Sequence, residues 1–351
     1  MNRTKVIFTL DAAAALRDTV AETAPSGVTV ISDSTVATIV LPSMSLPPDW
    51  NIITFPAGED NKNLDTCTAI WQDMTQSGMT RRSLVVNIGG GVTTDMGGFA
   101  AATFKRGARF INIPTTLLCA VDAALGGKTG VDFGGLKNEI GVFAPADAVI
   151  VDAGLFGSLP QSHLLSGYGE MLKHSLLHSQ EMFAETLALD ILDASAAEIN
   201  RHLELNIAVK SAIVDSDPLE RGPRKALNLG HTFGHALESI SIGRGHVLPH
   251  GIAVVHGLAV AMILSHLEKK LPTEYILHLA SLIKQHGFTA PPISCDDYPA
   301  LIELMGHDKK NAVAGHILFT LLDSPGCPVT DVEISPDLLR TALDIYRDLI
   351  G

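Results

Sequence analysis

The first 155 residues alternate short apolar runs rich in β-branched residues with longer stretches of helical periodicity. Short apolar runs bounded by turn residues are typical of buried strands, and apolar positions spaced three and four apart are typical of helices. Strands that alternate with helices favour a parallel sheet covered by helices on both faces. The pattern predicts strands at residues 5–9, 28–32, 52–55, 84–88, 110–113 and 148–152, and helices that include 63–77 and 94–103.

The pattern changes after residues 159–160, a Leu-Pro pair. From there to the end of the chain the 3.6-residue period of helices dominates, with few strand-like runs. We therefore expect an α/β N-terminal domain with a parallel sheet in residues 1–157. A mainly α-helical domain is expected to follow in residues 158–351.

The hydrophobic pattern predicts neither export nor a membrane anchor. The best candidate for a membrane helix, residues 252–265, is shorter than the ~18 residues required and is interrupted by His256 and Gly257. The first residues become charged too early to form the apolar core of a signal peptide. We expect a soluble cytoplasmic protein.

Composition excludes several classes of protein. With 25 Lys and Arg against 38 Asp and Glu the net charge is −13, which argues against a general nucleic-acid binder. A charged fraction of 18% with 46% hydrophobic residues excludes a disordered chain. The four cysteines are far apart and form no CxxC pair, as expected in a reducing compartment and not in a disulfide scaffold.

A glycine-rich turn directly follows the predicted strand at 84–88. Glycines here let the backbone approach a pyrophosphate, and the N-terminus of the next helix supplies free N–H groups. A tight strand-to-helix turn without a ligand would require the same glycines. Thr115 and Thr116 follow the neighbouring strand and face the same crevice, which favours nucleotide binding. The turn comprises Gly89, Gly90, Gly91, Val92, Thr93, Thr94 and Asp95.

A second glycine-rich segment, residues 121–138, carries Asp122, Lys128, Lys137 and Asn138. Lysines in such a segment are normally solvated surface charges. The functional alternative is a flexible loop that wraps a ligand and places ammonium and amide groups on an anion.

Three histidine or carboxylate segments of the second domain suggest a metal. Glu170, Lys173 and His174 share one helix face, and His231 and His235 are spaced four apart. A further segment offers His246, His250 and His256. Any one of these histidines could be a core or helix-end residue, but one glutamate with two histidines would leave an open catalytic zinc position. Spacing does not decide which histidine of each segment binds the metal.

Basic groups surround these segments although the chain is acidic. They suggest one concentrated anion site for a substrate with phosphate and carboxylate groups. The residues are Lys173, Lys210, Arg224, Lys309 and Lys310, with Asn228 one helical turn from Arg224.

Nine ordered segments make the chain resemble the 3-dehydroquinate synthases, members of the sugar-phosphate cyclases. No single segment would be specific, but their order and spacing between about residues 30 and 325 are. The segments are PAGEDNK (56–62), GGGVTTD (89–95), ATFKRG (102–107), PTTLL (114–118), VDAALGGKTGVDFGGLKN (121–138), GEMLKH (169–174), RKALNLGHTFGHALE (224–238), LPHGIAV (248–254) and HDKK (307–310).

The resemblance implies a homodimeric shikimate-pathway enzyme that needs NAD and a divalent metal, normally zinc. Such an enzyme converts 3-deoxy-D-arabino-heptulosonate 7-phosphate to 3-dehydroquinate and phosphate. NAD is reduced and reoxidised within one turnover.

The resemblance also implies roles for individual residues. The metal ligands would be Glu170, His231 and His250. NAD would contact Asp33, Glu59, Lys62, residues 89–95, Thr115 and Thr116, together with Lys128 and Lys137. Substrate would contact Lys128, Asn138, Lys173, Lys210, Arg224, Asn228, His235, one of Lys309 and Lys310, and Asp122, with Arg106 reaching the site of the neighbouring subunit.

Departures from the family pattern leave these positions in place. Ile252 stands where glutamate is common, and His256 is an added histidine. Two other enzymes remain alternatives: a sibling cyclase that acts on sedoheptulose 7-phosphate or glucose 6-phosphate, and a metal-dependent polyol dehydrogenase. A non-catalytic NAD- or metal-binding module would leave the combined metal and cation sets unexplained.

Overall fold

The computed structural model describes residues 4–218, 220, 222–306 and 316–350. The chain divides into two compact units. The first consists of residues 1–160 with 195–204, and the second of residues 161–194 with 205–351.

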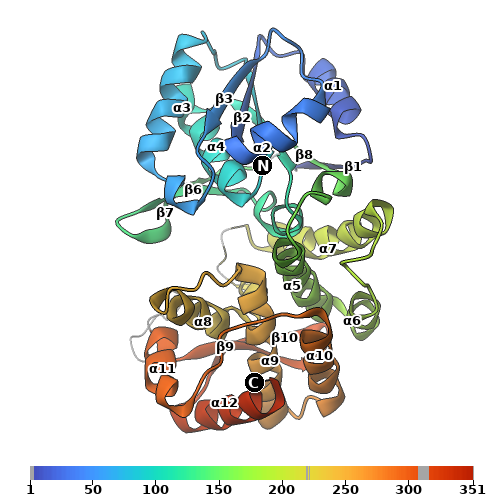
Figure 1. Ribbon diagram of the computed structural model, residues 1–351, viewed down its shortest axis with the longest axis vertical. Coiled ribbons are helices and arrows are strands. Elements are labelled where there is room, and N and C mark those ends of the chain that lie inside the picture. The colour runs from blue at the N-terminus through green and yellow to red at the C-terminus, as the bar shows by residue number, and fades with distance from the viewer. Residues whose placement is uncertain (1–3, 219, 221, 307–315, 351) are drawn as a thin grey trace. The chain divides into compact units, whose positions relative to one another are not determined.

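The first unit is built on a parallel sheet, which confirms the predicted fold class (Figure 1). Every pairing in this sheet is parallel, and the strand order is β1-β8-β5-β4-β2-β3. Each strand lies within two residues of its predicted position. The strands are β1 (Lys5–Phe8), β2 (Val28–Asp33), β3 (Asn51–Phe55), β4 (Leu84–Gly89), β5 (Arg109–Pro114) and β8 (Ala148–Val151).

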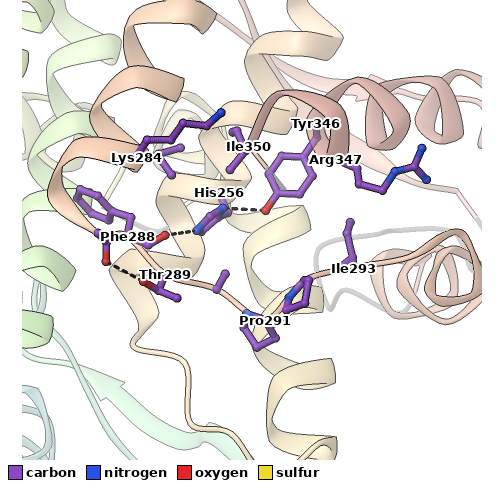
Figure 2. Close-up of a pocket in the computed structure, with 13 residues that line it drawn as sticks. His256, Lys284, Phe288, Thr289, Pro291, Ile293, Tyr346, Arg347 and Ile350 are labelled. Carbon is purple, nitrogen blue, oxygen red and sulfur yellow. Dashed lines mark hydrogen bonds between the residues drawn. The ribbon is translucent and has the colours of Figure 1, made fainter.

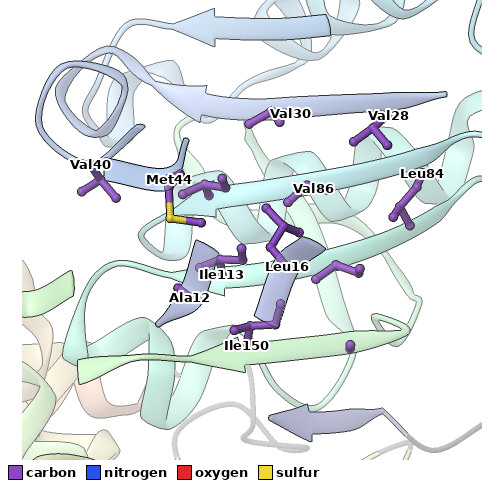
Figure 3. Packing of buried hydrophobic residues seen from close by; sticks show 13 residues of the cluster. Ala12, Leu16, Val28, Val30, Val40, Met44, Leu84, Val86, Ile113 and Ile150 are labelled. Carbon is purple, nitrogen blue, oxygen red and sulfur yellow. The ribbon is translucent and has the colours of Figure 1, made fainter. Parts of the chain in front are cut away.

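Helices cover both faces of the sheet. On one face, alternate strand residues such as Val30 and Val86 pack against Leu16 of α1 and against Met44 (Figure 3). On the other face, α4 approaches β4 so closely that a Cβ atom on Gly97 would lie 2.1 Å from the Asn87 side chain. The helices of this unit are α1 (Ala12–Thr23), α2 (Ser34–Ile39), α3 (Leu64–Gln76) and α4 (Gly91–Thr103), the last beginning three residues before its predicted start.

The expectation of a flexible loop over residues 121–138 is wrong. Residues 128–143 form an antiparallel hairpin of β6 (Lys128–Phe133) and β7 (Leu136–Phe143). Gly134 and Gly135 both have positive φ, 60° and 79°, as a two-residue hairpin turn of type I′ requires. The Gly-Gly pair between two extended runs was the sequence signal for this hairpin.

The second unit is mainly helical, as predicted. Its central helix, α9, is long and apolar enough to cross a membrane, but 83% of its apolar window is buried inside the fold, as in the core helix of a globular protein. The helices are α5 (Gln161–His178), α6 (Gln180–Leu187), α7 (Ala196–Ser216), α8 (His231–Gly243), α9 (His250–Lys269), α10 (Thr273–His286), α11 (Tyr298–Gly306) and α12 (Pro336–Ile350), and α7 begins in the first unit.

The second unit also contains a two-stranded sheet that the sequence pattern did not predict. Strands β9 (Leu318–Ser324) and β10 (Cys327–Glu333) form an antiparallel pair whose register shifts twice. One face of β9 packs on α9. These register shifts interrupt the alternation of apolar and polar positions by which a strand is recognised.

Candidate active site

The glycine-rich turn lies where β4 ends and α4 begins. Strand β4 ends at Gly89, Gly90 precedes the helix, and α4 starts at Gly91. A Cβ atom on Gly89 would lie 2.3 Å from Oγ1 of Thr93, so a larger residue does not fit here. The first turn of α4 therefore starts at the carboxyl end of β4, where parallel sheets bind anionic ligands.

Thr115 and Thr116 lie beside this turn, as expected. The N–H of Thr115 donates to the Gly89 carbonyl at 2.9 Å, and a Cβ atom on Gly90 would lie 3.3 Å from Cγ2 of Thr116. Among the described residues, the buried Oγ1 of Thr115 has no hydrogen-bond partner. A buried hydroxyl without a partner, next to glycines, fits the polar group of a bound nucleotide.

The two acidic residues expected at the nucleotide take different places. Asp33, at the end of β2, caps α2 through Oδ1, and its Oδ2 accepts a hydrogen bond from Oγ1 of Thr93 at 3.3 Å. It therefore touches the glycine-rich turn. Glu59 is exposed in a short 3-10 helix, and its charge acts on the pKa of both Lys62 and Asp95.

Lys62 is almost fully buried and connects α4 with the hairpin. Its Nζ donates to Oδ2 of Asp95 at 2.7 Å and to Oδ1 of Asn138 at 2.6 Å. Burial raises the pKa of Asp95 to about 6, although the Lys62 charge opposes that rise. The side chains of Lys128 and Lys137 are exposed on the hairpin. The expected substrate residue Asp122 lies in the π-helical turn Cys119–Ala123.

In the second unit, glycines let three helices come close enough to form a site. A Cβ atom on Gly169 of α5 would lie 2.2 Å from the Gly251 carbonyl oxygen at the start of α9. A Cβ atom on Gly257 of α9 would lie 1.7 Å from the carbonyl oxygen of Gly230, which precedes α8. Backbone contact at these points brings together the residues beside Gly169, Gly230 and Gly251.

Those residues are Glu170, His231 and His250. Nε2 of His231 and Nε2 of His250 each lie 3.6 Å from the same atom, Oε1 of Glu170. This separation is too long for a hydrogen bond. It is close to the ligand-to-ligand distance of about 3.4 Å that bonds of ~2.0–2.1 Å give around a tetrahedral zinc ion. The three atoms therefore fit the corners of a metal site.

Both histidines are held in the tautomer that a metal requires. Nδ1 of His231 lies 3.2 Å from the Leu229 carbonyl and Nδ1 of His250 lies 3.0 Å from Oε2 of Glu238. Each of these oxygens can only accept, so each Nδ1 carries the proton. Nε2 of each ring is then the nitrogen left for a metal, and both Nε2 atoms face Glu170.

The carboxylates of Glu170 and Glu238 favour positive charge at the two histidines. Glu170 is fully buried, and Lys173 forms an ion pair with its Oε2. Burial alone would raise the pKa of the Glu170 carboxyl, but Lys173 and the two histidines hold that pKa well below its usual range. Burial would also lower the pKa of His250, yet the carboxylates of Glu170 and Glu238 raise it to about 10. Positive charge is therefore stabilised at this point.

His235, one helical turn after His231, belongs to the same cluster. Nitrogen atoms of His231, His235 and His250 lie within 4.8 Å of one another. The ring centroid of His235 is 5.2 Å from that of His231 and 5.7 Å from that of His250. Its side chain is at least partly exposed, so it lies at the more open side of the cluster.

Two further expected substrate residues of this unit are buried cations. Lys210 on α7 and Arg224 are almost fully buried, and Nη1 of Arg224 donates to the Pro218 carbonyl at 2.9 Å. Arg224 and Asn228 lie on one short 3-10 helix that packs against α5, which carries Glu170. Lys309 and Lys310 lie outside the described residues.

Arg106 in the first unit has an unusual backbone. Its φ is 68°, its side chain is exposed, and its carbonyl accepts from Nη2 of Arg81 at 3.2 Å. The exposed guanidinium is available to a second molecule.

Comparison with known proteins shows the family. The model of the 3-dehydroquinate synthase N-terminal domain matches residues 52–166, and that of the C-terminal domain matches residues 167–311. The chain belongs to the 3-dehydroquinate synthase family. It is therefore an enzyme, since members of this family are carbon–oxygen lyases.

Similarity to named 3-dehydroquinate synthases extends over most or all of the chain. The 3-dehydroquinate synthase of Parabacteroides distasonis is 40% identical over 354 residues and covers 100% of both chains. That of Oceanobacillus iheyensis is 38% identical over 328 residues, covering 91% of this chain and 88% of its own. The solved 2-deoxy-scyllo-inosose synthase with carbaglucose-6-phosphate, NAD+ and Co2+ has a TM-score of 0.85 at 23% identity, over 98% of this chain and 96% of its own. At that identity the likeness concerns the fold.

Glu238 of this 3-dehydroquinate synthase family member lies at the site, although the sequence did not single it out as a site residue. It is seven residues after His231 on α8, and its carboxylate holds Nδ1 of His250. A carboxylate that holds a histidine ligand is a recurring feature of metal sites. The signal was present: two helical turns separate the residues, so both lie on one face of the helix.

His256, the added histidine, lies in a different environment (Figure 2). Its Nε2 lies 2.8 Å from the carbonyl oxygen of Phe288, and Nδ1 lies 2.7 Å from the Tyr346 hydroxyl. The carbonyl can only accept, so Nε2 carries the proton and Tyr346 donates to Nδ1. Burial lowers the pKa of His256 to about 4, so the ring is neutral. It is a core histidine that joins α9 to α12, beside a cavity of about 270 Å³.

Proposed function

We propose that this enzyme converts 3-deoxy-D-arabino-heptulosonate 7-phosphate to 3-dehydroquinate and phosphate, with NAD and a divalent metal, in the shikimate pathway. Membership of the 3-dehydroquinate synthase family supports the reaction. The observation that carries the proposal is the convergence of Nε2 of His231 and Nε2 of His250 on Oε1 of Glu170, each at 3.6 Å. One carboxylate with two imidazoles leaves coordination positions for a substrate.

Glu170, His231 and His250 would hold the metal, which we propose to be zinc. When bound, a divalent cation polarises substrate oxygens as a Lewis acid. Leu229 and Glu238 fix the tautomers of the two histidines, and Lys173 keeps Glu170 ionised. His235, exposed beside them, is proposed to contact substrate and not metal, because the other two rings are the ones directed at Glu170.

The N-terminal domain of residues 1–157 is proposed to bind NAD. When bound there, NAD would supply a hydride acceptor that is regenerated within one turnover, so no net oxidation would result. The N–H groups of the α4 turn and the buried hydroxyl of Thr115 would hold its polar groups. The remaining proposed contacts are Asp33, Glu59, Lys62, Gly89–Asp95, Thr116, Lys128 and Lys137.

The phosphate and carboxylate of the substrate need a set of cations and amides. Buried Lys210 and Arg224 suit this role, because a guanidinium in a protected site binds an oxyanion more strongly than one in water. We assign to the same set Lys128, Asn138, Lys173, Asn228, Asp122 and one of Lys309 and Lys310.

The enzyme is proposed to act as a cytoplasmic homodimer in which Arg106 serves the partner's site. The exposed side chain and the left-handed backbone of Arg106 support a specific placement, since an arginine rarely adopts φ of 68° without a structural requirement.

The test is phosphate release from the sugar phosphate in the presence of NAD, with and without a chelator. We expect NAD- and metal-dependent release of phosphate, the appearance of 3-dehydroquinate, and no accumulation of NADH. Glu170→Gln should abolish release, and Glu268→Gln, which changes an exposed glutamate on α9, should not. Accumulation of NADH in proportion to turnover would indicate a polyol dehydrogenase. A preference for sedoheptulose 7-phosphate or glucose 6-phosphate would indicate a sibling cyclase.

A further inference from the structure

The β6–β7 hairpin contains an irregular segment that redirects one side chain. The register shifts between Val131 and Phe133, so residues 137–139 of β7 lie opposite Asp132 alone. At the centre of this bulge Asn138 has φ of 53°, in the left-handed region that asparagine tolerates better than most residues. Bulges commonly re-aim a side chain, and here the side chain is that of Asn138.

Lys62 completes a closed ring of contacts with this bulge. Its carbonyl accepts from the N–H of Asp132 at 2.8 Å, and Oδ1 of Asp132 accepts from the N–H of Asn138 at 2.7 Å. Nζ of Lys62 then donates to Oδ1 of Asn138 at 2.6 Å. The Lys62 side chain is only 4% exposed and its ammonium is paired with Asp95 at 2.7 Å, so its position is fixed.

This ring determines which end of the Asn138 amide is presented. An ammonium has three donors and no acceptor, so the atom of Asn138 that faces it must be the oxygen. The amide nitrogen, with its two donors, then points away from Lys62, and Asn138 is an exposed residue. Donors suit an anionic oxygen, whereas the amide oxygen would repel it.

We infer that Lys62 is a positioning residue that holds Asn138 with its N–H donors toward an anionic oxygen of the substrate. The inference rests on the proposed function for the identity of the substrate. It assigns to Lys62 a role through Asn138, beside its proposed contact with NAD. Because Asp95 belongs to the glycine-rich turn segment, the same lysine joins that segment to the hairpin.

The principal test is a double-mutant cycle with Lys62→Met and Asn138→Gly. Glycine keeps the left-handed backbone and removes only the amide. Each single variant should raise KM for the sugar phosphate about 10-fold to 100-fold, as expected for one lost hydrogen bond to a charged group. In Asn138→Gly, NAD affinity measured by calorimetry should change less than about 2-fold. The double variant should be no worse than Asn138→Gly, because Lys62 acts through Asn138.

Other variants separate positioning from folding. Asn138→Asp preserves the contact with Lys62 but presents an acceptor, so its KM should exceed that of Asn138→Gly. Lys62→Arg keeps a donor-only cation and should recover part of the loss, whereas Lys5→Met, which removes one exposed charge of the first unit, should have no effect. If Lys62→Met fails to fold, the comparison of Asn138→Asp with Asn138→Gly decides, since both retain Lys62.

Three results would overturn the inference: multiplicative effects in the double variant, a raised Kd for NAD with unchanged KM in Lys62→Met, or an Asn138→Asp variant that binds as well as wild type. Wild-type turnover tests the proposed function separately. Calorimetric titration of inorganic phosphate into each variant should rank the variants in the same order by phosphate affinity, without any turnover. This measurement tests the positioning role even if another sugar phosphate proves to be the substrate.

Discussion

Replacing Glu238 by glutamine should weaken metal binding while leaving the three proposed metal ligands in place. Oε2 of Glu238 accepts a hydrogen bond from Nδ1 of His250 at 3.0 Å, and the pair is only partly exposed. The amide of glutamine can still accept that bond, but its negative charge is lost. Alanine removes both the charge and the bond.

The size of the effect follows from this difference. Outer carboxylates that hold a histidine ligand typically contribute 10-fold to 100-fold in metal affinity, or about 1.4–2.7 kcal/mol. We expect Glu238→Gln near 10-fold, because the tautomer of His250 is retained. Glu238→Ala should approach 100-fold, because the ring also loses its orientation.

The assay is direct titration of the metal-free enzyme with zinc in a metal buffer, followed by calorimetry and by recovery of phosphate release. At saturating zinc, Glu238→Gln should regain most of the wild-type kcat, since no substrate contact is lost. Glu268→Gln, on the same helix as His250 but exposed, is the matched control. A zinc Kd within 2-fold of wild type for both Glu238 variants would refute the role of this carboxylate.

Three further predictions follow from other parts of the structure. Gly90→Val should weaken NAD binding without unfolding the first unit. The φ of −78° at Gly90 suits any residue, but the new side chain would crowd Thr116 beside the turn. An unchanged NAD affinity in calorimetry would show that the nucleotide does not bind at this turn. If Arg106 acts across the dimer, a mixed dimer of inactive Arg106→Ala and inactive Glu170→Gln subunits has one site that lacks both groups and one intact site. Mixing the two variants should then restore up to about half of the activity per mixed dimer. Demonstrated subunit exchange without recovery of activity would contradict this. The free energy of unfolding should fall by up to about 3 kcal/mol as the pH drops from 6.5 to 4. Burial lowers the pKa of His256 to about 4, so between these pH values the histidine takes up a proton in the unfolded chain but not in the folded one. In urea titrations His256→Gln should reduce this dependence of stability on pH.

The sequence was sufficient to predict the elements whose pattern is regular. The six strands of the parallel sheet are short, apolar and bounded by turn residues, so each was located within two residues. The hairpin at 128–143 was missed because its residues are mostly exposed and β7 contains a bulge, so no apolar alternation marks it. The β9–β10 pair was missed for a related reason, its two register shifts.

Candidate site residues could be selected from the sequence, but their arrangement could not. Glycine spacing suggested the α4 turn, and the Glu170 and histidine segments suggested a metal. Spacing gave no preference between His231 and His235, whereas the structure directs Nε2 of His231 and of His250 at Glu170. Contacts such as that of Lys62 with Asn138 join residues 76 positions apart, and no local period reports them.

The position of the two histidines explains why the site needs more than one carboxylate. His231 and His250 are the first residues of α8 and α9, where the N-terminus of a helix carries partial positive charge. That charge disfavours a metal cation, and the buried ammonium of Lys173 adds to it. The charge of Glu170, the proposed ligand, offsets one part, and Glu238 offsets another through His250. Gly230 and Gly251 allow close backbone contact at these helix ends, so packing determines where His231 and His250 lie. The negative charge that a metal cation needs must then come from the two carboxylates.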